Sequence, residues 1–144
     1  MKPIRILEVD QNQETVPLQA NTQGVWVRFT SRDVEGWATF MHGKSSSDSD
    51  LEGRDFFVET SYEKMQSLAR VDEAVLESIE PLSTAGDFLI HATVKVASDD
   101  GVVYCSAGEF NFMINVPIDD RPLFAPGARI TMEVIGLILW DVNA

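Results

Sequence analysis

The sequence predicts a mainly β (α+β) fold: a single antiparallel β barrel or sandwich with one helical insertion near residues 61–80. Three observations support this class. Apolar and polar residues alternate with a period of two over most of the chain, which is typical of strands that bury one face. The period lengthens to three and four residues only between Thr60 and Glu80, which indicates a helix. The 144 residues include no linker-like stretch long enough to divide them, so we expect one β-rich domain over 1–144.

The N-terminal part of the chain is predicted to form strands. Residues 4–9 (IRILEV) have the composition of a short strand. Residues 24–30 and 35–41 alternate, and the polar SRDV between them can turn the chain, so together they predict a β-hairpin. Residues 54–60 (RDFFVET) are β-like because they combine paired aromatic residues with valine.

The segment after Thr60 is predicted to be helical. Thr60 and Glu63 match a T-x-x-E capping box, in which each side chain satisfies a backbone donor at the start of a helix. Apolar residues then recur at three- and four-residue steps and form one stripe: Met65, Leu68, Ala69, Val75, Leu76 and Ile79. The same spacing places three acidic residues on a second face: Glu73, Glu77 and Glu80. Pro81 ends the segment, because the residue before proline is pushed out of helical geometry.

The C-terminal half returns to a period of two. Strands are predicted at 88–96, 102–107, 109–116 and 129–140, with a proline-punctuated loop at 117–128. Between the first two strands, the SDDG of residues 98–101 indicates a hairpin turn, because its glycine accepts the positive φ that such turns need. Gly136, inside the last strand, predicts a bulge or a bend.

The chain is strongly acidic. Its 23 acidic and 11 basic residues give a net charge of −12 at pH 7, and the excess is concentrated between Asp48 and Asp100. Such a field repels nucleic acid phosphates and anionic lipid headgroups, and it attracts basic proteins or divalent cations. We therefore expect a basic protein partner, no nucleic acid and no membrane. The alternative is that the acidity serves only to keep the protein soluble.

Other sequence features predict a soluble, cytoplasmic protein. The longest apolar run, at 134–140, is too short to span a bilayer, and the first residues lack the apolar run of a signal peptide. Cys105 is the only cysteine, so an internal disulfide is impossible. Nothing in the sequence indicates an oligomeric state.

The spacing of the glycines at 36 and 43 excludes a phosphate-binding loop in this segment. Six residues separate Gly36 from Gly43, where a nucleotide-binding loop needs four, and no helix start follows Lys44. Without the converging amides of a helix N-terminus, this segment has nothing to hold a phosphate.

A calcium site is the stronger of the two loop hypotheses. The stretch DSDLEGRDFFVE, residues 48–59, resembles an EF-hand loop over its twelve residues, with Gly53 at the sixth position. The oxygen ligands at the loop positions would be Asp48, Asp50, Glu52 and Glu59. Asp55 departs from the pattern, because the eighth position is usually aliphatic, and no helix is predicted before the loop. Calcium binding through this loop stays an alternative.

The residues that could support catalysis are few. His42 and His91 are the only histidines, and neither has metal-ligand spacing such as H-E-x-x-H. We expect His91 to make a cross-strand hydrogen bond and Cys105 to be a buried, inert thiol. A Cys105–His91 nucleophile pair stays open, because neighbours in space need not be neighbours in sequence. The sequence therefore predicts no enzyme.

Two tryptophans form a candidate binding patch. By alternation, Trp26 shares a face with Arg28, whereas Val25 and Val27 take the other face. If the valine face is the core, Trp26 and Trp37 lie on the outer surface of adjacent strands and suit a protein partner. In the alternative interpretation, the tryptophans fill the interior.

These observations predict a small, acidic, non-enzymatic protein-binding domain. An inhibitor or immunity-type protein that covers a basic partner is the version we favour, because rigid carboxylates give electrostatically steered association. The alternatives are a calcium-binding module at 48–59 and a small-ligand-binding β-barrel. The predicted partner-binding residues are Glu73, Glu77, Glu80, Asp48, Asp50, Glu52, Asp55, Trp26 and Trp37.

The net charge leads to a direct prediction about nucleic acid. A random-sequence oligonucleotide should not bind with micromolar affinity near physiological salt, because the counterion-release term that supplies non-specific affinity is missing. Fluorescence anisotropy of a labelled oligonucleotide measures this, and a micromolar Kd would contradict the charge argument.

Overall fold

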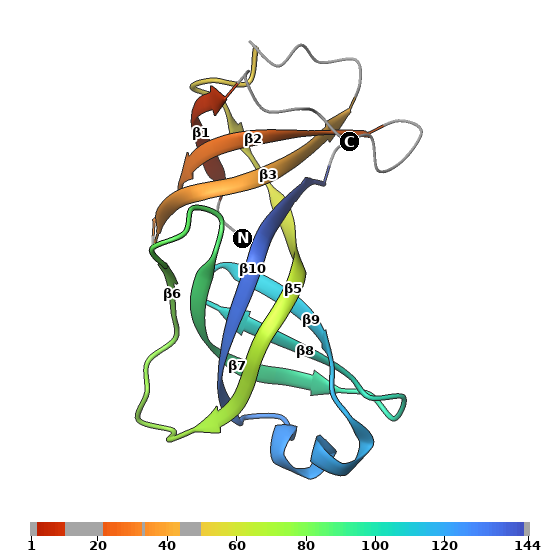
Figure 1. The fold of residues 1–144 in the computed structure, drawn as a ribbon. Coiled ribbons are helices and arrows are strands. Elements are labelled where there is room, and N and C mark those ends of the chain that lie inside the picture. The colour runs from red at the N-terminus through yellow and green to blue at the C-terminus, as the bar shows by residue number, and fades with distance from the viewer. Residues whose placement is uncertain (1–2, 11–21, 33, 44–49, 143–144) are drawn as a thin grey trace.

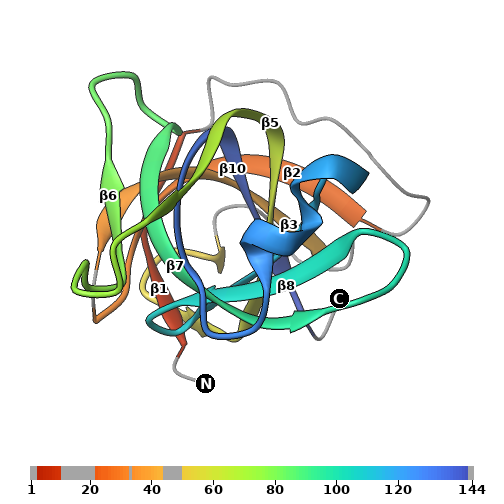
Figure 2. The same cartoon turned by 90° about the horizontal axis from the view of Figure 1, so that it is seen from below.

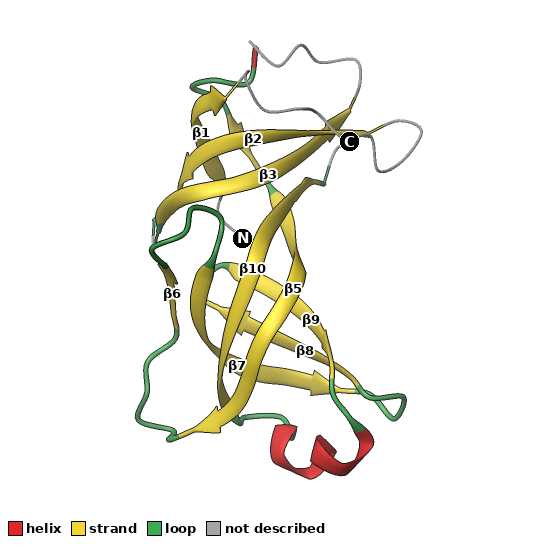
Figure 3. Ribbon diagram, in the orientation of Figure 1, coloured by secondary structure: helices red, strands yellow, loops and turns green. Residues whose placement is uncertain are grey.

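The computed structural model describes residues 3–10, 22–32, 34–43 and 50–142. The described chain forms a 10-stranded sheet and a short 3-10 helix (Figures 1 and 3). The strands are β1 (Ile4–Asp10), β2 (Thr22–Thr30), β3 (Glu35–Gly43), β4 (Asp55–Phe56), β5 (Val58–Val71), β6 (Ser78–Pro81), β7 (Phe88–Ala97), β8 (Val102–Ala107), β9 (Phe110–Asn115) and β10 (Arg129–Asp141); the 3-10 helix is η2 (Ile118–Phe124). No helix among these residues has the length and apolarity needed to cross a membrane.

The predicted mainly β class is confirmed, with a sandwich-like arrangement of one sheet that does not close. The strand order is β4-β1-β2-β3-β10-β7-β8-β9, with β5 added to β10 and β6 added to β7. Seen from below, β5, β10, β7 and β8 curve around a common interior (Figure 2). The expectation of a purely antiparallel sheet is wrong, because β3 and β10 pair in parallel. These two strands are far apart in the sequence, so no hairpin forces them to be antiparallel.

Strand β10 is shared by both ends of the sheet. One of its edges pairs with β5 along nearly its whole length. The other edge pairs with β7 over 129–134 and with β3 over 138–140. In Figure 1, β10 and β5 run between β1–β3 at the upper end and β7–β9 at the lower end.

The change of partner along β10 coincides with a kink at Gly136, which confirms the predicted bend. Gly136 has φ +70°, a conformation that favours glycine. Buried residues alternate up to Val134 and then resume at Leu137, one position out of phase. The Gly136 amide donates to Asp87 Oδ1 at 3.2 Å, and the Leu137 amide donates to the Gly86 carbonyl at 2.9 Å. The loop before β7 therefore satisfies the backbone groups that lie between the two ladders.

The predicted helical insertion near 61–80 is wrong. Strand β5 runs through Val71, a turn follows, and β6 begins at Ser78. The misleading spacing comes from a bulge at Gln66: Met65 pairs with Val134, whereas Leu68 pairs with Met132. Met65 and Leu68 are three residues apart, yet both pack against the core, because their partners are two apart on the same face of β10. Long-range pairing with β10 overrides the local helical signal.

The capping-box prediction at the start of this segment is also wrong. The Thr60 hydroxyl donates to the Asn111 carbonyl of β9 instead of to a backbone amide of its own segment.

The two parts of the sheet pack against each other through aromatic rings. Phe29 of β2 lies 6.2 Å from Phe88 of β7 and 6.5 Å from Phe110 of β9, measured between ring centroids. Phe29 and Phe88 are fully buried, and burial of such a side chain stabilises a fold by about 1.5–3 kcal/mol. The same buried face of β2 carries Val25 and Val27, so the valine face is the core.

Candidate functional site

The outer face of β1, β2 and β3 carries the two predicted tryptophans. Because the valine face of β2 is buried, Trp26 and Arg28 point to the opposite side, as the alternation predicted. Arg28 pairs with Trp37 of β3 in the sheet register, so this indole lies on the same outer face. The alternative in which the tryptophans fill the interior is therefore wrong.

The two indoles form one stacked pair. Their ring centroids are 5.7 Å apart and their planes differ by 14°, within the usual range for an aromatic pair. Both side chains are half-buried. The outer edge of Trp26 lies against Gly86 so closely that a Cβ there would be 2.7 Å from Cη2. Gly86 thus lets the loop before β7 support the stack.

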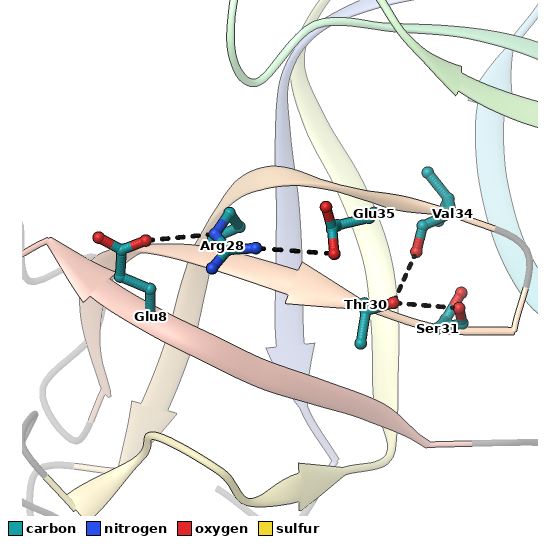
Figure 4. Close-up of polar contacts among 6 residues, drawn as sticks. All are labelled: Glu8, Arg28, Thr30, Ser31, Val34 and Glu35. Carbon is teal, nitrogen blue, oxygen red and sulfur yellow. Dashed lines mark hydrogen bonds and ion pairs between the residues drawn. The ribbon is translucent and has the colours of Figure 1, made fainter.

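Charged side chains flank the stack on both neighbouring strands. Arg28 Nε donates to Glu8 Oε2 at 3.2 Å, and Arg28 Nη1 lies 3.6 Å from Glu35 Oε1 (Figure 4). These groups are exposed, and such pairs contribute about 0–1 kcal/mol each. Two carboxylates share one guanidinium, so the group carries a net negative charge. We call Glu8, Trp26, Arg28, Glu35 and Trp37 the tryptophan face.

The β2–β3 turn fixes the end of this face. In Figure 4 the Thr30 hydroxyl approaches the carbonyl oxygens of Val34 and Ser31, at 3.4 and 3.3 Å, and the Ser31 amide donates to the Val34 carbonyl at 2.8 Å. These contacts close the hairpin and keep Glu35 beside Arg28.

The three glutamates predicted to share a helix face do not share one, because no helix forms there. Glu73 is exposed in the turn after β5, and Glu80 is exposed in β6. Glu77 is half-buried between them and makes several internal contacts. They are therefore not one acidic surface.

Glu77 connects β7, the turn between β8 and β9, and β10. Its Oε2 accepts from the Thr93 hydroxyl at 2.6 Å, and its Oε1 accepts from the Gly108 amide at 2.9 Å. Arg129 Nη1 lies 3.9 Å from Oε2 and also donates to the Val75 carbonyl at 3.2 Å. Charge-assisted hydrogen bonds of this kind are stronger than neutral ones, so Glu77 has a structural role.

The acidic residues of the calcium hypothesis make other contacts. Asp48 lies outside the described residues. Glu52 accepts from the Val9 amide at 3.0 Å, and Asp55 forms an ion pair with Arg5 at 2.8 Å, whose hydrogen bond lowers the pKa of the Asp55 carboxyl. Within the described ranges, no group of three or more His, Cys, Asp or Glu side chains is placed to hold a metal.

The other two predicted calcium ligands, Asp50 and Glu59, also lie apart from a metal site. Asp50 is exposed, and Glu59 is exposed within β5, where its register partner is Trp140 of β10. A strand that begins at Val58 replaces the end of the expected loop.

Cys105 does not form a nucleophile pair with His91. Cys105 pairs with Val94 of β7, and both are buried on the core face. His91 lies on the other face of β7, where Nδ1 is 3.1 Å from the Ser78 hydroxyl across the β6–β7 ladder, as predicted. Burial, and then the negative charge of Glu77, raise the pKa of the Cys105 thiol to about 12, so it stays protonated near neutral pH.

His42 occupies a buried position. Its ring stacks on Phe40 with 5.9 Å between centroids, and Nδ1 donates to the Gly43 carbonyl at 2.9 Å. This packing accounts for a histidine at position 42 without assigning it a catalytic role.

No family model matches the chain, and no curated protein or solved structure matches it either. The function must therefore be inferred from the surface of the protein itself.

Sequence reasoning missed the groups around the tryptophans. Glu8 pairs with Arg28 only because β1 has an irregular register between Ile6 and Glu8. Gly86 belongs to a loop 60 positions from Trp26 in the numbering, and no local signal connects them. Only the alternation in β2 pointed to this face.

We predict that Gly86→Ala destabilises the protein more than Gly127→Ala. Both glycines have φ +93°, so the backbone strain is the same, about 1–3 kcal/mol. A Cβ at Gly127 meets nothing within 4 Å, whereas one at Gly86 must displace Trp26. Urea unfolding measures the difference, and near-ultraviolet circular dichroism should show the disturbed indoles in the first variant only. Equal free energies of unfolding for the two variants would contradict the claim that the close contact between Gly86 and Trp26 matters for stability.

We also predict that Glu77→Ala lowers the free energy of unfolding by about 1–3 kcal/mol, because the buried Thr93 hydroxyl and the Gly108 amide lose their acceptor. Glu80→Ala is the control, since this exposed carboxylate should change stability by less than about 0.5 kcal/mol. Urea unfolding of both variants provides the comparison. A Glu77 variant as stable as its control would show that the hydrogen bonds do not contribute.

Proposed function

We propose that the protein is a non-enzymatic binding domain that recognises a basic protein through the tryptophan face. The observation that carries the proposal is the stacked Trp26–Trp37 pair, half-buried on the outer face of the sheet and flanked by Glu8 and Glu35. Tryptophans are over-represented among the residues that contribute most to protein–protein affinity.

The rigidity of the pair favours binding. Trp26 is held between Trp37 and Gly86, so its ring is already oriented. A partner that packs on the stack would lose little side-chain entropy, because the orientation exists before binding. Aromatic side chains also provide a large contact area with few rotatable bonds.

The charge of the molecule favours a basic partner. Glu8 and Glu35 share a single guanidinium, and the whole chain carries −12, so a positive surface is attracted to this face. Electrostatic attraction of this kind mainly raises the association rate. Within this class we favour an inhibitor or immunity-type protein that covers a basic site on its partner, acting in the cytoplasm.

The proposal predicts that charge reversal on the tryptophan face slows partner association. Glu8→Lys/Glu35→Lys should reduce the association rate about tenfold at low salt, with a smaller effect at high salt. Trp37→Ala should raise the dissociation rate, because it removes contact area and not charge. Affinity capture with the wild-type protein followed by surface plasmon resonance of each retained protein measures these rates.

The matched control is Asp119→Lys/Asp120→Lys, which changes the net charge equally. These two acidic residues lie in the first turn of η2, at the opposite end of the molecule from β1–β3 (Figure 1). Their reversal should leave most of the association rate intact. A partner that binds all variants with the same rates would exclude the tryptophan face as its binding site.

A further inference from the structure

A groove of about 600 Å³ opens between the start of β5 and the strands β8 and β9. It shares no lining residue with the tryptophan face, which belongs to β1–β3. Its lining is mainly apolar and includes Val58, Tyr104, Phe112, Met113 and Trp140. Pockets for small molecules have volumes of about 300–1,000 Å³ and apolar walls with few polar groups, and this groove matches both properties.

The groove exists because the sheet does not close. Within the described ranges, β5 pairs only with β10, and β9 pairs only with β8. Where the two strands approach each other, a single side-chain hydrogen bond from Thr60 to the Asn111 carbonyl takes the place of a backbone ladder. The remaining space between the strand edges is the groove.

The floor of the groove reaches the core. Cys105 and Phe112 both line it and are each 2% exposed. Protein–protein contact surfaces are usually flatter, whereas a concave site with a buried floor is typical of small-ligand binding. The buried floor therefore favours a small molecule over a protein surface as the occupant.

One wall continues into an exposed apolar row. Val96, Tyr104 and Met113 are register partners across β7, β8 and β9, and they are 54%, 47% and 58% exposed. Contiguous exposed apolar side chains mark binding sites more often than scattered ones do. On the other side, Trp140 Nε1 donates to the Ser61 hydroxyl at 2.8 Å, which fixes the indole as the facing wall.

The groove is lined by one cation and one carboxylate, Lys95 and Glu59, which do not pair with each other. Lys95 lines it from β7, and in the described part of the chain its ammonium has neither an ion pair nor a hydrogen bond, although the protein is acidic. Glu59 lines it from β5 and forms no ion pair with Lys95. An unpaired ammonium beside an apolar surface attracts an anion that has an apolar body.

We propose that this groove binds a small amphipathic carboxylate, with its hydrocarbon or aromatic body between Tyr104 and Trp140 and its carboxylate on Lys95. The site is independent of the proposed protein-binding face, so either proposal can fail alone. A medium-chain fatty acid has this chemistry and serves as the probe.

The test compares three compounds by isothermal titration calorimetry: dodecanoate and dodecyltrimethylammonium, each below its micellar concentration, and dodecanol, below its solubility limit. Dodecanoate should bind the wild-type protein roughly tenfold more tightly than dodecanol, because a charge-assisted hydrogen bond is added, and the ammonium compound should bind most weakly. Binding should also change the tryptophan fluorescence, and this change should be lost in Trp140→Phe.

Variants of the groove complete the test. Lys95→Met keeps the apolar stem and removes the charge, so it should reduce dodecanoate affinity roughly tenfold and leave dodecanol unchanged. Met113→Glu places a carboxylate on the exposed wall. It should weaken dodecanoate binding more than Lys95→Met does, because it adds a repulsive charge. Lys64→Met, on an exposed lysine of β5 that does not line the groove, is the control and should bind like wild type.

Three results would overturn the proposal. Wild-type protein that binds none of the three compounds, with the two ionic ones at millimolar concentration, would exclude a small-ligand site and leave a partner protein as the occupant of the groove. Equal affinity for dodecanoate and dodecanol would exclude recognition of the carboxylate. Undiminished dodecanoate binding by both Lys95→Met and Met113→Glu would place the binding elsewhere.

Discussion

The fold depends on a single strand that serves two ladders on one edge. β10 must leave β7, its antiparallel neighbour, and meet β3, which runs parallel to it, while its other edge stays paired with β5. A regular strand would leave unpaired backbone groups between the two partners, and unpaired buried groups cost free energy. The positive φ of Gly136 reorients the strand, and Gly86 and Asp87 accept the two amides in the interval. Without this junction, β1–β3 and β7–β9 would have no common strand.

The same junction positions both candidate sites. Gly86 accepts the Leu137 amide through its carbonyl, while its missing side chain makes room for Trp26. The stacked indoles are therefore tied to the place where β10 changes partner. Beyond that place, β10 continues to Trp140, which forms one wall of the β5–β9 groove. The groove and the tryptophan face thus lie on different surfaces of the protein, but both depend on β10 and its junction at Gly136.

Most strands could be predicted from the sequence, because their alternation is a local property of residues that bury one face. β5 could not, since its apolar spacing results from the bulge at Gln66, and the bulge exists only in the pairing with β10. The candidate site was predictable to the same extent. Alternation placed Trp26 outside once the valine face was taken as the core, but Gly86 and the Glu8–Arg28 pair depend on tertiary register. The groove left no sequence signal, because it lies between strand edges whose neighbours the sequence does not specify.

The distribution of charge explains why acidity alone could not locate a binding surface. Glu77 binds internal donors, Asp55 pairs with Arg5, and Glu8 and Glu35 compete for Arg28, so the carboxylates differ in what they can offer a partner. The net charge produces a general attraction for positive molecules, and a field of that kind carries little specificity. Specificity requires a surface whose shape complements the ligand. Aromatic side chains form such a surface at the tryptophan face and in the groove. Glu8 and Glu35 flank the stacked indoles, whereas the groove carries one lysine and one glutamate, Lys95 and Glu59. The two sites share no residue and differ in their local charge, so they need not compete for the same ligand.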